Sequence, residues 1–131
     1  MLDDFIKSNG LKAKILQGTI KSDLVRCRIF AGKKEDVLII SLRANTLDYP
    51  KMQALVGVVE PLEEEQVKET TGYKKEFLPP ISIYGLRVLI DKKVLEKESV
   101  HCILSHEKTL EISPQEIKDF NDDVEVVDIT K

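Results

Sequence analysis

The sequence has 131 residues, of which 42% are hydrophobic and 33% are charged, and its formal net charge is −3. This length suits one domain, residues 1–131, because half of it would bury too small a core. No apolar run approaches the ~18 to 20 residues of a membrane-spanning helix. The start Met-Leu-Asp-Asp lacks the basic flank and apolar centre of a signal peptide. A cytoplasmic protein is therefore predicted. The net charge argues against nucleic-acid binding over the whole surface, but it allows a local basic patch that binds phosphate.

The first third of the chain predicts a helix, a short strand and a hairpin of two strands. Their residue ranges are 2–9, 13–16, 24–31 and 37–42. The first hairpin strand alternates, so that Arg26 and Arg28 share one face and Cys27 lies on the other. The second hairpin strand is almost continuously apolar, which is typical of a central strand.

Two helices are predicted in the middle of the chain. Asp48 precedes Tyr-Pro, which suits the start of a helix, and the apolar stripe that follows ends at Gly57. Pro61 is predicted to open a second helix. Glutamates in its first turn interact favourably with the positive N-terminal end of the helix dipole. That helix runs to Thr70 and ends at Gly72.

A stiff loop and a buried strand follow this helix. The loop closes with Pro79 and Pro80, which restrict the backbone. Residues 87–91 form an apolar run that predicts a core strand ending in Asp91. We expect this aspartate to cap the next turn rather than to act in catalysis. A helix end, a rigid loop and a core strand can together hold a concave site in fixed geometry.

The last third predicts strands and one further helix. The strands are expected at residues 100–104, 110–112 and 124–129. Between the last two, Ser113-Pro114 followed by Glu116 is a specific helix-start pattern, and the helix is predicted from Pro114 to about Asn121. The mixture of helices with adjacent strands predicts an α+β (mixed α/β) fold, in which helices pack on a central mixed β-sheet.

The cysteines and histidines give no sign of a metal site. Cys27 and Cys102 each lie in an apolar strand-like run, so buried thiols are expected. His101 and His106 fall on opposite sides if the strand continues through both. His101 is read as a structural residue and His106 as a solvated one, with a functional role for each as the alternative. Walker, dinucleotide-binding, nucleophile-elbow and zinc-protease motifs are all missing.

One set of sequence features resembles a known family. Thr71-Gly72-Tyr73, Pro80, the strand 87–91 and the segment 110–117 occur in an order and at intervals that resemble the YbaK/ProX family. These proteins are aminoacyl-tRNA deacylases related to the editing domain of prolyl-tRNA synthetase. The resemblance runs from about Val25 to Ile117.

The resemblance implies a hydrolase that removes a wrong amino acid from the 3′-terminal ribose of tRNA, without a metal or other cofactor. Its partners would be the tRNA acceptor 3′ end with the attached amino acid and an aminoacyl-tRNA synthetase. Such a reaction needs the terminal adenosine held, the carbonyl oxygen met by donors and a water or ribose hydroxyl in line. In the family, a lysine on the early strand, a Gly-x-x-x-Pro loop and a glycine-rich late turn line the pocket.

This chain departs from the family pattern at its pocket. Arg26 takes the lysine position, where a guanidinium can hold phosphate but has no proton available for transfer. Glu76 stands at the first glycine of the loop, where it would repel phosphate, select a cationic amino acid or polarise water. The late turn has Ser105 and His106 in place of glycines. The helix before the early strand is shortened to residues 19–24.

The resemblance implies Arg26 as the catalytic residue that anchors the terminal nucleotide. The implied substrate-binding residues are Thr71, Gly72, Tyr73, Glu76, Pro80, Ser105 and His106. Structural readings stand beside these: Arg26 as a solvated strand arginine, Gly72 as a helix stop and Pro80 as a loop constraint. The alternative function is a catalytically inactive module of the same fold that binds the tRNA 3′ end, a nucleotide or a synthetase.

Overall fold

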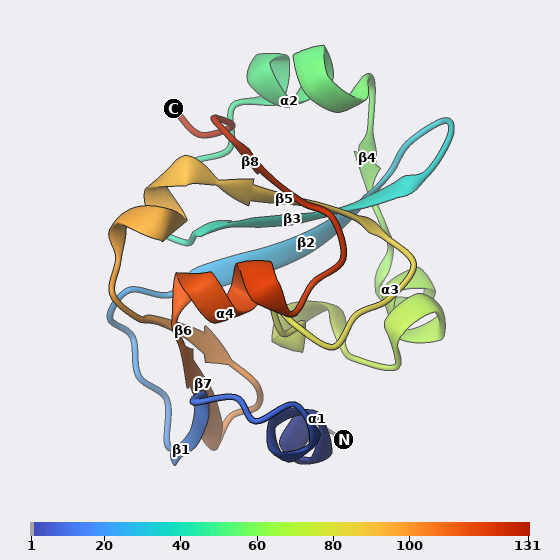
Figure 1. Ribbon diagram of the computed structural model, residues 1–131. Coiled ribbons are helices and arrows are strands. Elements are labelled where there is room, and N and C mark those ends of the chain that lie inside the picture. The colour runs from blue at the N-terminus through green and yellow to red at the C-terminus, as the bar shows by residue number, and fades with distance from the viewer. Residues whose placement is uncertain (1) are drawn as a thin grey trace.

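Two β-sheets form the centre of the structure, a computed structural model that describes residues 2–131 (Figure 1). The larger sheet has five strands in the order β4-β2-β3-β5-β8, and the smaller has three in the order β1-β7-β6. The strands are β1 (Lys14–Gln17), β2 (Val25–Ala31), β3 (Asp36–Leu42), β4 (Glu60–Pro61), β5 (Arg87–Asp91), β6 (Val100–Ile103), β7 (Lys108–Ile112) and β8 (Val124–Val127). Met1, the first residue of the predicted domain, lies outside the described residues.

Helices surround both sheets. They are α1 (Leu2–Ser8), α2 (Tyr49–Val56), α3 (Glu64–Thr71) and α4 (Pro114–Asp119), with the 3-10 helices η1 (Lys75–Phe77) and η2 (Lys92–Glu96). In Figure 1, α2 lies above the larger sheet, α4 lies in front of the region between the sheets and α1 lies beside the smaller sheet. The helix α1 and the C-terminal end of the chain are on opposite sides of the view in Figure 1.

The larger sheet is built on the predicted hairpin. β2 and β3 pair antiparallel, with Val25 opposite Leu42 and Ala31 opposite Asp36. β3 then pairs in parallel with β5, and β5 with β8. β3 is buried along nearly its whole length, because it has a strand on each edge and apolar layers on both faces. The predicted α+β fold with a mixed sheet is therefore confirmed, with a second, antiparallel sheet beside it.

Each face of the larger sheet is covered by its own apolar layer. Cys27 and Ile40 belong to the larger layer, which also holds Cys102 of the smaller sheet and Ile117 of α4. Side chains on the other face belong to a second layer with Met52 of α2. The alternation predicted for β2 thus divides its side chains between two cores.

Three local signals were read correctly from the sequence. The Ser113 hydroxyl accepts a hydrogen bond from the Glu116 N–H at 3.2 Å, with Pro114 in the first helical turn. Gly72 ends α3 in the left-handed conformation with φ of 80°. Asp91 caps η2 by accepting from the Lys93 N–H at 3.3 Å. Each of these residues satisfies backbone groups that the helix itself leaves open.

Two predicted helical segments are wrong. Pro61 lies in β4 and pairs with Phe30 of β2, whereas α3 begins after Glu63, whose backbone N–H donates to the Gln66 side chain at 3.0 Å. Proline suits the start of a helix and an edge strand equally, so the local pattern could not decide. Residues 19–24 form no helix and pass as a loop into β2.

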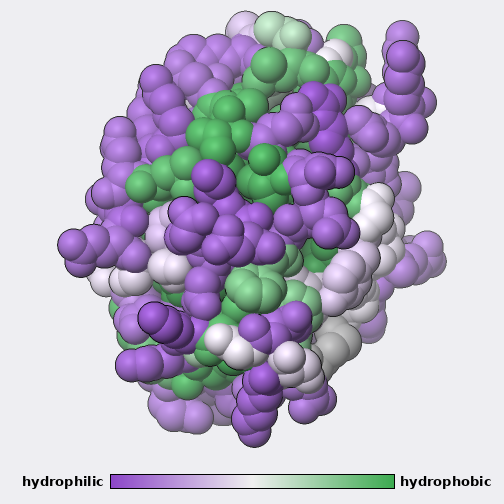
Figure 2. All heavy atoms as spheres, in the orientation of Figure 1, coloured by the Kyte–Doolittle hydropathy of each residue, from purple (hydrophilic) through white to green (hydrophobic). Residues whose placement is uncertain are grey.

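Hydrophilic residues cover most of the face seen in Figure 2, and hydrophobic residues reach this surface in its upper part and again in smaller areas lower down. Leu55 of α2 and Val126 of β8 are 44% exposed each. Within residues 2–131, no helix has both the length and the apolar character needed to cross a membrane.

Candidate active site

A cavity of about 600 Å³ opens beside β2, where the two sheets move apart. Leu24, which lines the cavity, forms a parallel bridge with His101, and the His101 N–H donates to the Asp23 carbonyl at 3.0 Å. Beyond this bridge the strands separate, and Cys27 of β2 and Cys102 of β6 both line the space between them. The cavity therefore has walls from both sheets.

The wall that β2 contributes is an open strand edge. β4 pairs with β2 only at Phe30 and Ala31, so the earlier part of this edge has no partner strand there. The Leu62 N–H donates to the Ile29 carbonyl at 3.0 Å, which shows that Ile29 directs its backbone groups to this edge. Cys27, two residues earlier, directs its N–H and C=O to the same side and thus towards the cavity.

A further part of the lining comes from η1 and the residue after it. Lys75, Glu76, Phe77 and Leu78 all line the cavity. The Cys102 thiol donates to the Leu78 carbonyl at 3.2 Å, which holds this loop against β6. The loop contains no left-handed residue between 73 and 81, so a helix stop at Gly72 and two prolines determine its path.

Positive side chains dominate the cavity. Five lysines and arginines line it against two glutamates, in a protein whose net charge is −3. The cations are Lys21, Arg26, Arg28, Arg43 and Lys75, and the anions are Glu64 and Glu76. Across residues 2–131, Arg26, Arg28 and Arg43 form no ion pair. This excess charge is suited to an anionic ligand.

Hairpin register explains why three arginines meet. Arg26 lies opposite Ser41, and Arg43 follows two residues later on the same face of the sheet. Partial burial, and then the charges of Arg28 and Arg43, lower the pKa of Arg26, while Tyr49 acts in the opposite direction. The guanidinium of Arg28 lies 5.2 Å from the centre of the Phe30 ring, which fixes it by a cation–π contact.

The two cysteines meet at the floor of the cavity as buried free thiols, as predicted. A hydrogen bond with Cys102, together with burial, raises the pKa of Cys27 well above its usual value. A protonated thiol is a poor nucleophile. Cys27 therefore contributes backbone groups and packing to the site rather than a thiolate.

Three of the residues named from the sequence line this cavity: Arg26, Glu76 and His106. They come from β2, from η1 and from the turn between β6 and β7. The His106 ring packs edge-on against Phe77, with 5.3 Å between ring centres. His101 is structural, as expected: its ring nitrogens contact the Ser22 carbonyl at 2.7 Å and Glu111 at 3.1 Å.

Five other named residues do not line the cavity, and their contacts hold the chain in place. The Thr71 hydroxyl donates to the Val67 carbonyl at 2.8 Å, and the Gly72 N–H caps α3. Tyr73 and Pro80 contact Ser82 and Asn121, respectively. Ser105 accepts from the Glu107 N–H at 3.2 Å. Their direct contact with substrate stays a prediction.

The sequence reading did not single out Lys21, Arg43 and Lys75. Arg43 could have been found, because the hairpin register places it beside Arg26 once the turn is known. Lys21 lies in an irregular segment and Lys75 in the short helix η1, and both reach the cavity only through the tertiary fold. Histidine, cysteine and acidic residues form no group of three suited to a metal ion anywhere in residues 2–131.

The fold is that of a class of small α+β domains with known structures. A hypothetical protein, APE2540, has a TM-score of 0.86 at 20% identity, with 99% of each chain covered. A proposed trans-editing enzyme for prolyl-tRNA synthetase also has a TM-score of 0.86, at 19% identity, with 99% of this chain and 94% of that chain covered. No curated protein sequence matches this chain.

The chain belongs to the aminoacyl-tRNA editing domain family, whose model matches residues 13–120. The matched segment includes Leu24 and His101, whose bridge joins the two sheets, and every residue that lines the cavity. The resemblance noted in the sequence to the YbaK/ProX-like editing domains is therefore confirmed.

Proposed function

We propose that this protein is an aminoacyl-tRNA deacylase, which hydrolyses the ester between a wrongly attached amino acid and the 3′-terminal ribose of tRNA. The observation that carries the proposal is the unpaired arginine cluster at Arg26 beside the open edge of β2, within a cavity of about 600 Å³. That volume lies within the ~300–1,000 Å³ usual for small-ligand sites. Residues 1–131 would act as one domain.

Charge complementarity orients the substrate in this proposal. An aminoacyl ester carries a phosphate on one side and an α-ammonium group on the other. Arg26 would bind the phosphate of the terminal nucleotide, and Glu76, which lines the same cavity, would face the ammonium group. Glu76, which stands where the family has a glycine, would then attract the ammonium group of the amino acid, and it would not lie against the phosphate.

In this proposal, backbone N–H groups rather than side chains stabilise the negative charge that develops on the carbonyl oxygen. The Cys27 N–H and the N–H groups of the η1 loop would face the ester carbonyl and stabilise the oxyanion. Water attacks the carbonyl carbon and loses a proton to solvent, directly or through the neighbouring ribose hydroxyl. The bond from the carbonyl carbon to the ribose oxygen breaks, and that oxygen takes up a proton from solvent. Arg26 acts by holding the nucleotide, because its guanidinium does not give up a proton at neutral pH.

A panel of mischarged tRNAs tests the proposal. Ester loss is measured with and without protein, and at least one aminoacyl-tRNA should be hydrolysed faster than in buffer. Arg26→Ala should then reduce kcat/KM by about 10- to 100-fold, the loss expected for one charge-assisted hydrogen bond. Lys33→Ala is the control, since Lys33 lies in the β2–β3 turn and does not line the cavity. Equal effects of the two changes would exclude Arg26 as an anchor.

The second candidate is a binding module that keeps the fold without hydrolysis. One observation favours it: Arg26 stands where the family has a lysine, and a guanidinium has no proton available for transfer. Such a module would bind the tRNA 3′ end or a synthetase partner. A folded protein that binds tRNA but accelerates no ester hydrolysis across the panel would identify it.

A further inference from the structure

A second hollow of about 540 Å³ adjoins the candidate active site. The two share Lys21, Leu24 and Arg43 as a common wall. The second hollow extends from this wall to Lys97, which lies just before β6, and to Asn45 after β3. A ligand that enters the first cavity can therefore continue into the second without leaving the protein surface.

Three separate segments hold this hollow in shape. The Arg43 N–H donates to the Leu24 carbonyl at 2.8 Å, which closes the end of the hairpin. The Asn45 N–H donates to the Leu42 carbonyl at 3.0 Å and turns the chain after β3. Lys97 reaches Asp23 at 3.2 Å from the far side. Backbone hydrogen bonds and one ion pair therefore hold the walls of this hollow in place.

The charge of the second hollow is positive. Lys21, Arg43 and Lys97 line it, and Asp23 is its single acidic residue among those described. Asp23 pairs with Lys97, whereas Lys21 and Arg43 have no ion pair within residues 2–131. Two cations are therefore available to an anion that lies next to the shared wall, and an arginine fork suits phosphate in particular.

We propose that this second hollow binds the phosphodiester one nucleotide upstream of the terminal nucleotide, in a single-stranded RNA 3′ end. The inference deepens the proposed function, on which it rests. Arg26 binds the phosphate of the terminal nucleotide, and Arg43 and Lys21 bind the next one. Lys97, which also contacts Asp23, adds its positive charge from the far side of the hollow. Leu24 and Leu42, which also line the hollow, provide apolar contact for the ribose.

Two short RNAs separate the hollows experimentally. The dinucleotide CpA carries one phosphodiester, and the trinucleotide CpCpA carries two. Affinities of the wild-type protein should be higher for CpCpA. Lys97→Ala should weaken CpCpA binding about fivefold, as one lost charge contact near a surface implies, and should leave CpA binding unchanged. Lys33→Ala should alter neither.

A second variant should shift affinity in the opposite direction. Asp23→Asn removes the acidic residue beside the site, so CpCpA should bind more tightly while CpA stays the same. Asp23 has a φ of 48°, a conformation that asparagine also tolerates. Damage to the fold would weaken binding, so tighter binding cannot arise from a merely structural effect.

The outcomes distinguish the inference from the function on which it rests. If CpA binds but neither Lys97→Ala nor Asp23→Asn acts selectively on CpCpA, the second hollow is not a phosphodiester site. If inorganic phosphate displaces CpCpA at concentrations that leave CpA bound to wild-type protein, the hollow is a free-phosphate site and the RNA assignment is wrong. If neither RNA binds the folded protein, the inference falls together with nucleotide binding in the first cavity.

Discussion

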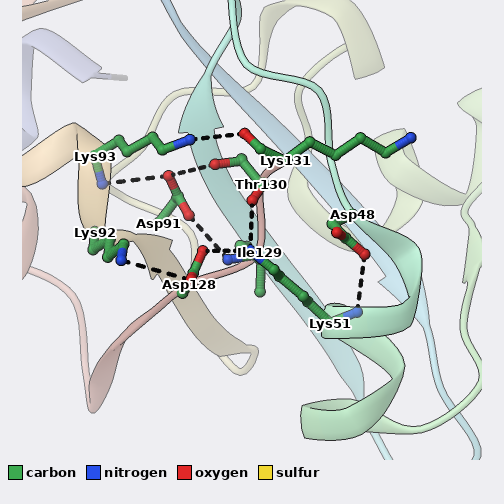
Figure 3. Close-up of polar contacts among 9 residues, drawn as sticks. All are labelled: Asp48, Lys51, Asp91, Lys92, Lys93, Asp128, Ile129, Thr130 and Lys131. Carbon is green, nitrogen blue, oxygen red and sulfur yellow. Dashed lines mark hydrogen bonds and ion pairs between the residues drawn. The ribbon is translucent and has the colours of Figure 1, made fainter.

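Asp91 illustrates how one side chain can join distant parts of the chain (Figure 3). Its carboxylate is fully buried and accepts from the Ile129 N–H at 3.0 Å, the Thr130 hydroxyl at 3.1 Å and the Lys93 N–H at 3.3 Å. The contact with Lys93 follows from local sequence, because aspartate before a turn is a cap. The contacts with residues 129 and 130 join positions nearly 40 residues apart, which no local pattern could reveal.

Asp91→Ala should destabilise the protein by about 3 kcal/mol. Loss of the carboxylate leaves the Ile129 N–H and the Thr130 hydroxyl buried without partners, at roughly 1–3 kcal/mol for each unsatisfied group. Urea unfolding followed by circular dichroism measures the change. Asp128→Asn is a matched control, because this neighbour forms ion pairs only at the exposed surface with Lys51 and Lys92. A loss no greater than that of the control would mean that water replaces the buried contacts.

The organisation of α3 shows what can be predicted for one element. Its end was predicted correctly, since few residues other than glycine favour the φ of 80° found at Gly72. Its start was not, because the two-residue strand β4 exists only through pairing with β2. Helix stops are properties of single residues, whereas a short strand is a property of two segments that meet in the fold.

Gly72→Ala should cost about 1 kcal/mol through backbone strain alone. A methyl group at this position would meet no atom within 4 Å, so the cost arises from the left-handed conformation. Gly72→Asn should cost less, since asparagine tolerates that conformation. Thermal unfolding of both variants provides the measurement. A larger loss for Asn than for Ala would contradict this explanation.

The edge of the larger sheet has a pH-dependent contact between neighbouring strands. Arg87 of β5 donates to Glu125 of β8 through two nitrogens, at 2.7 and 3.0 Å. These hydrogen bonds lower the pKa of Glu125 below its usual value. The folded state therefore keeps this carboxylate ionised at a pH where the unfolded chain already binds a proton.

The stability from this contact should be present above the unfolded pKa, near pH ~4.3, and should be lost as pH falls through the lower folded value. Glu125→Gln removes this dependence. Urea midpoints measured at about pH 6 and about pH 3 should therefore fall less in the variant than in the wild type. The difference should be only a few tenths of a kcal/mol, because the Glu125 side chain is 45% exposed. Identical pH profiles would show that solvent screens the pair completely.

At the scale of the whole molecule, the candidate site results from the meeting of two sheets. The hairpin, its register and the arginines on one face can be derived from sequence, because alternation and turn position decide them. The bridge between Leu24 and His101 cannot, and this bridge determines where β2 and β6 separate. The hairpin register therefore places Arg26 and Arg43 on one face in advance, whereas the approach of Lys21 to them could not be foreseen.

The distribution of charge over the molecule leads to a prediction for salt dependence. The net charge of −3 gives no general attraction to RNA, so binding should depend on the few cations of the two hollows. With two phosphates of a single strand neutralised, log K should fall with log salt at a slope of about −1.4, or roughly 7-fold in affinity between 50 and 200 mM salt. Filter binding of deacylated tRNA measures this slope. Arg43→Ala should make it shallower by about 0.7, while Lys33→Ala should leave it unchanged. A slope of about −5 or steeper would indicate phosphate contacts far outside these hollows, and a slope near zero would exclude phosphate recognition by them.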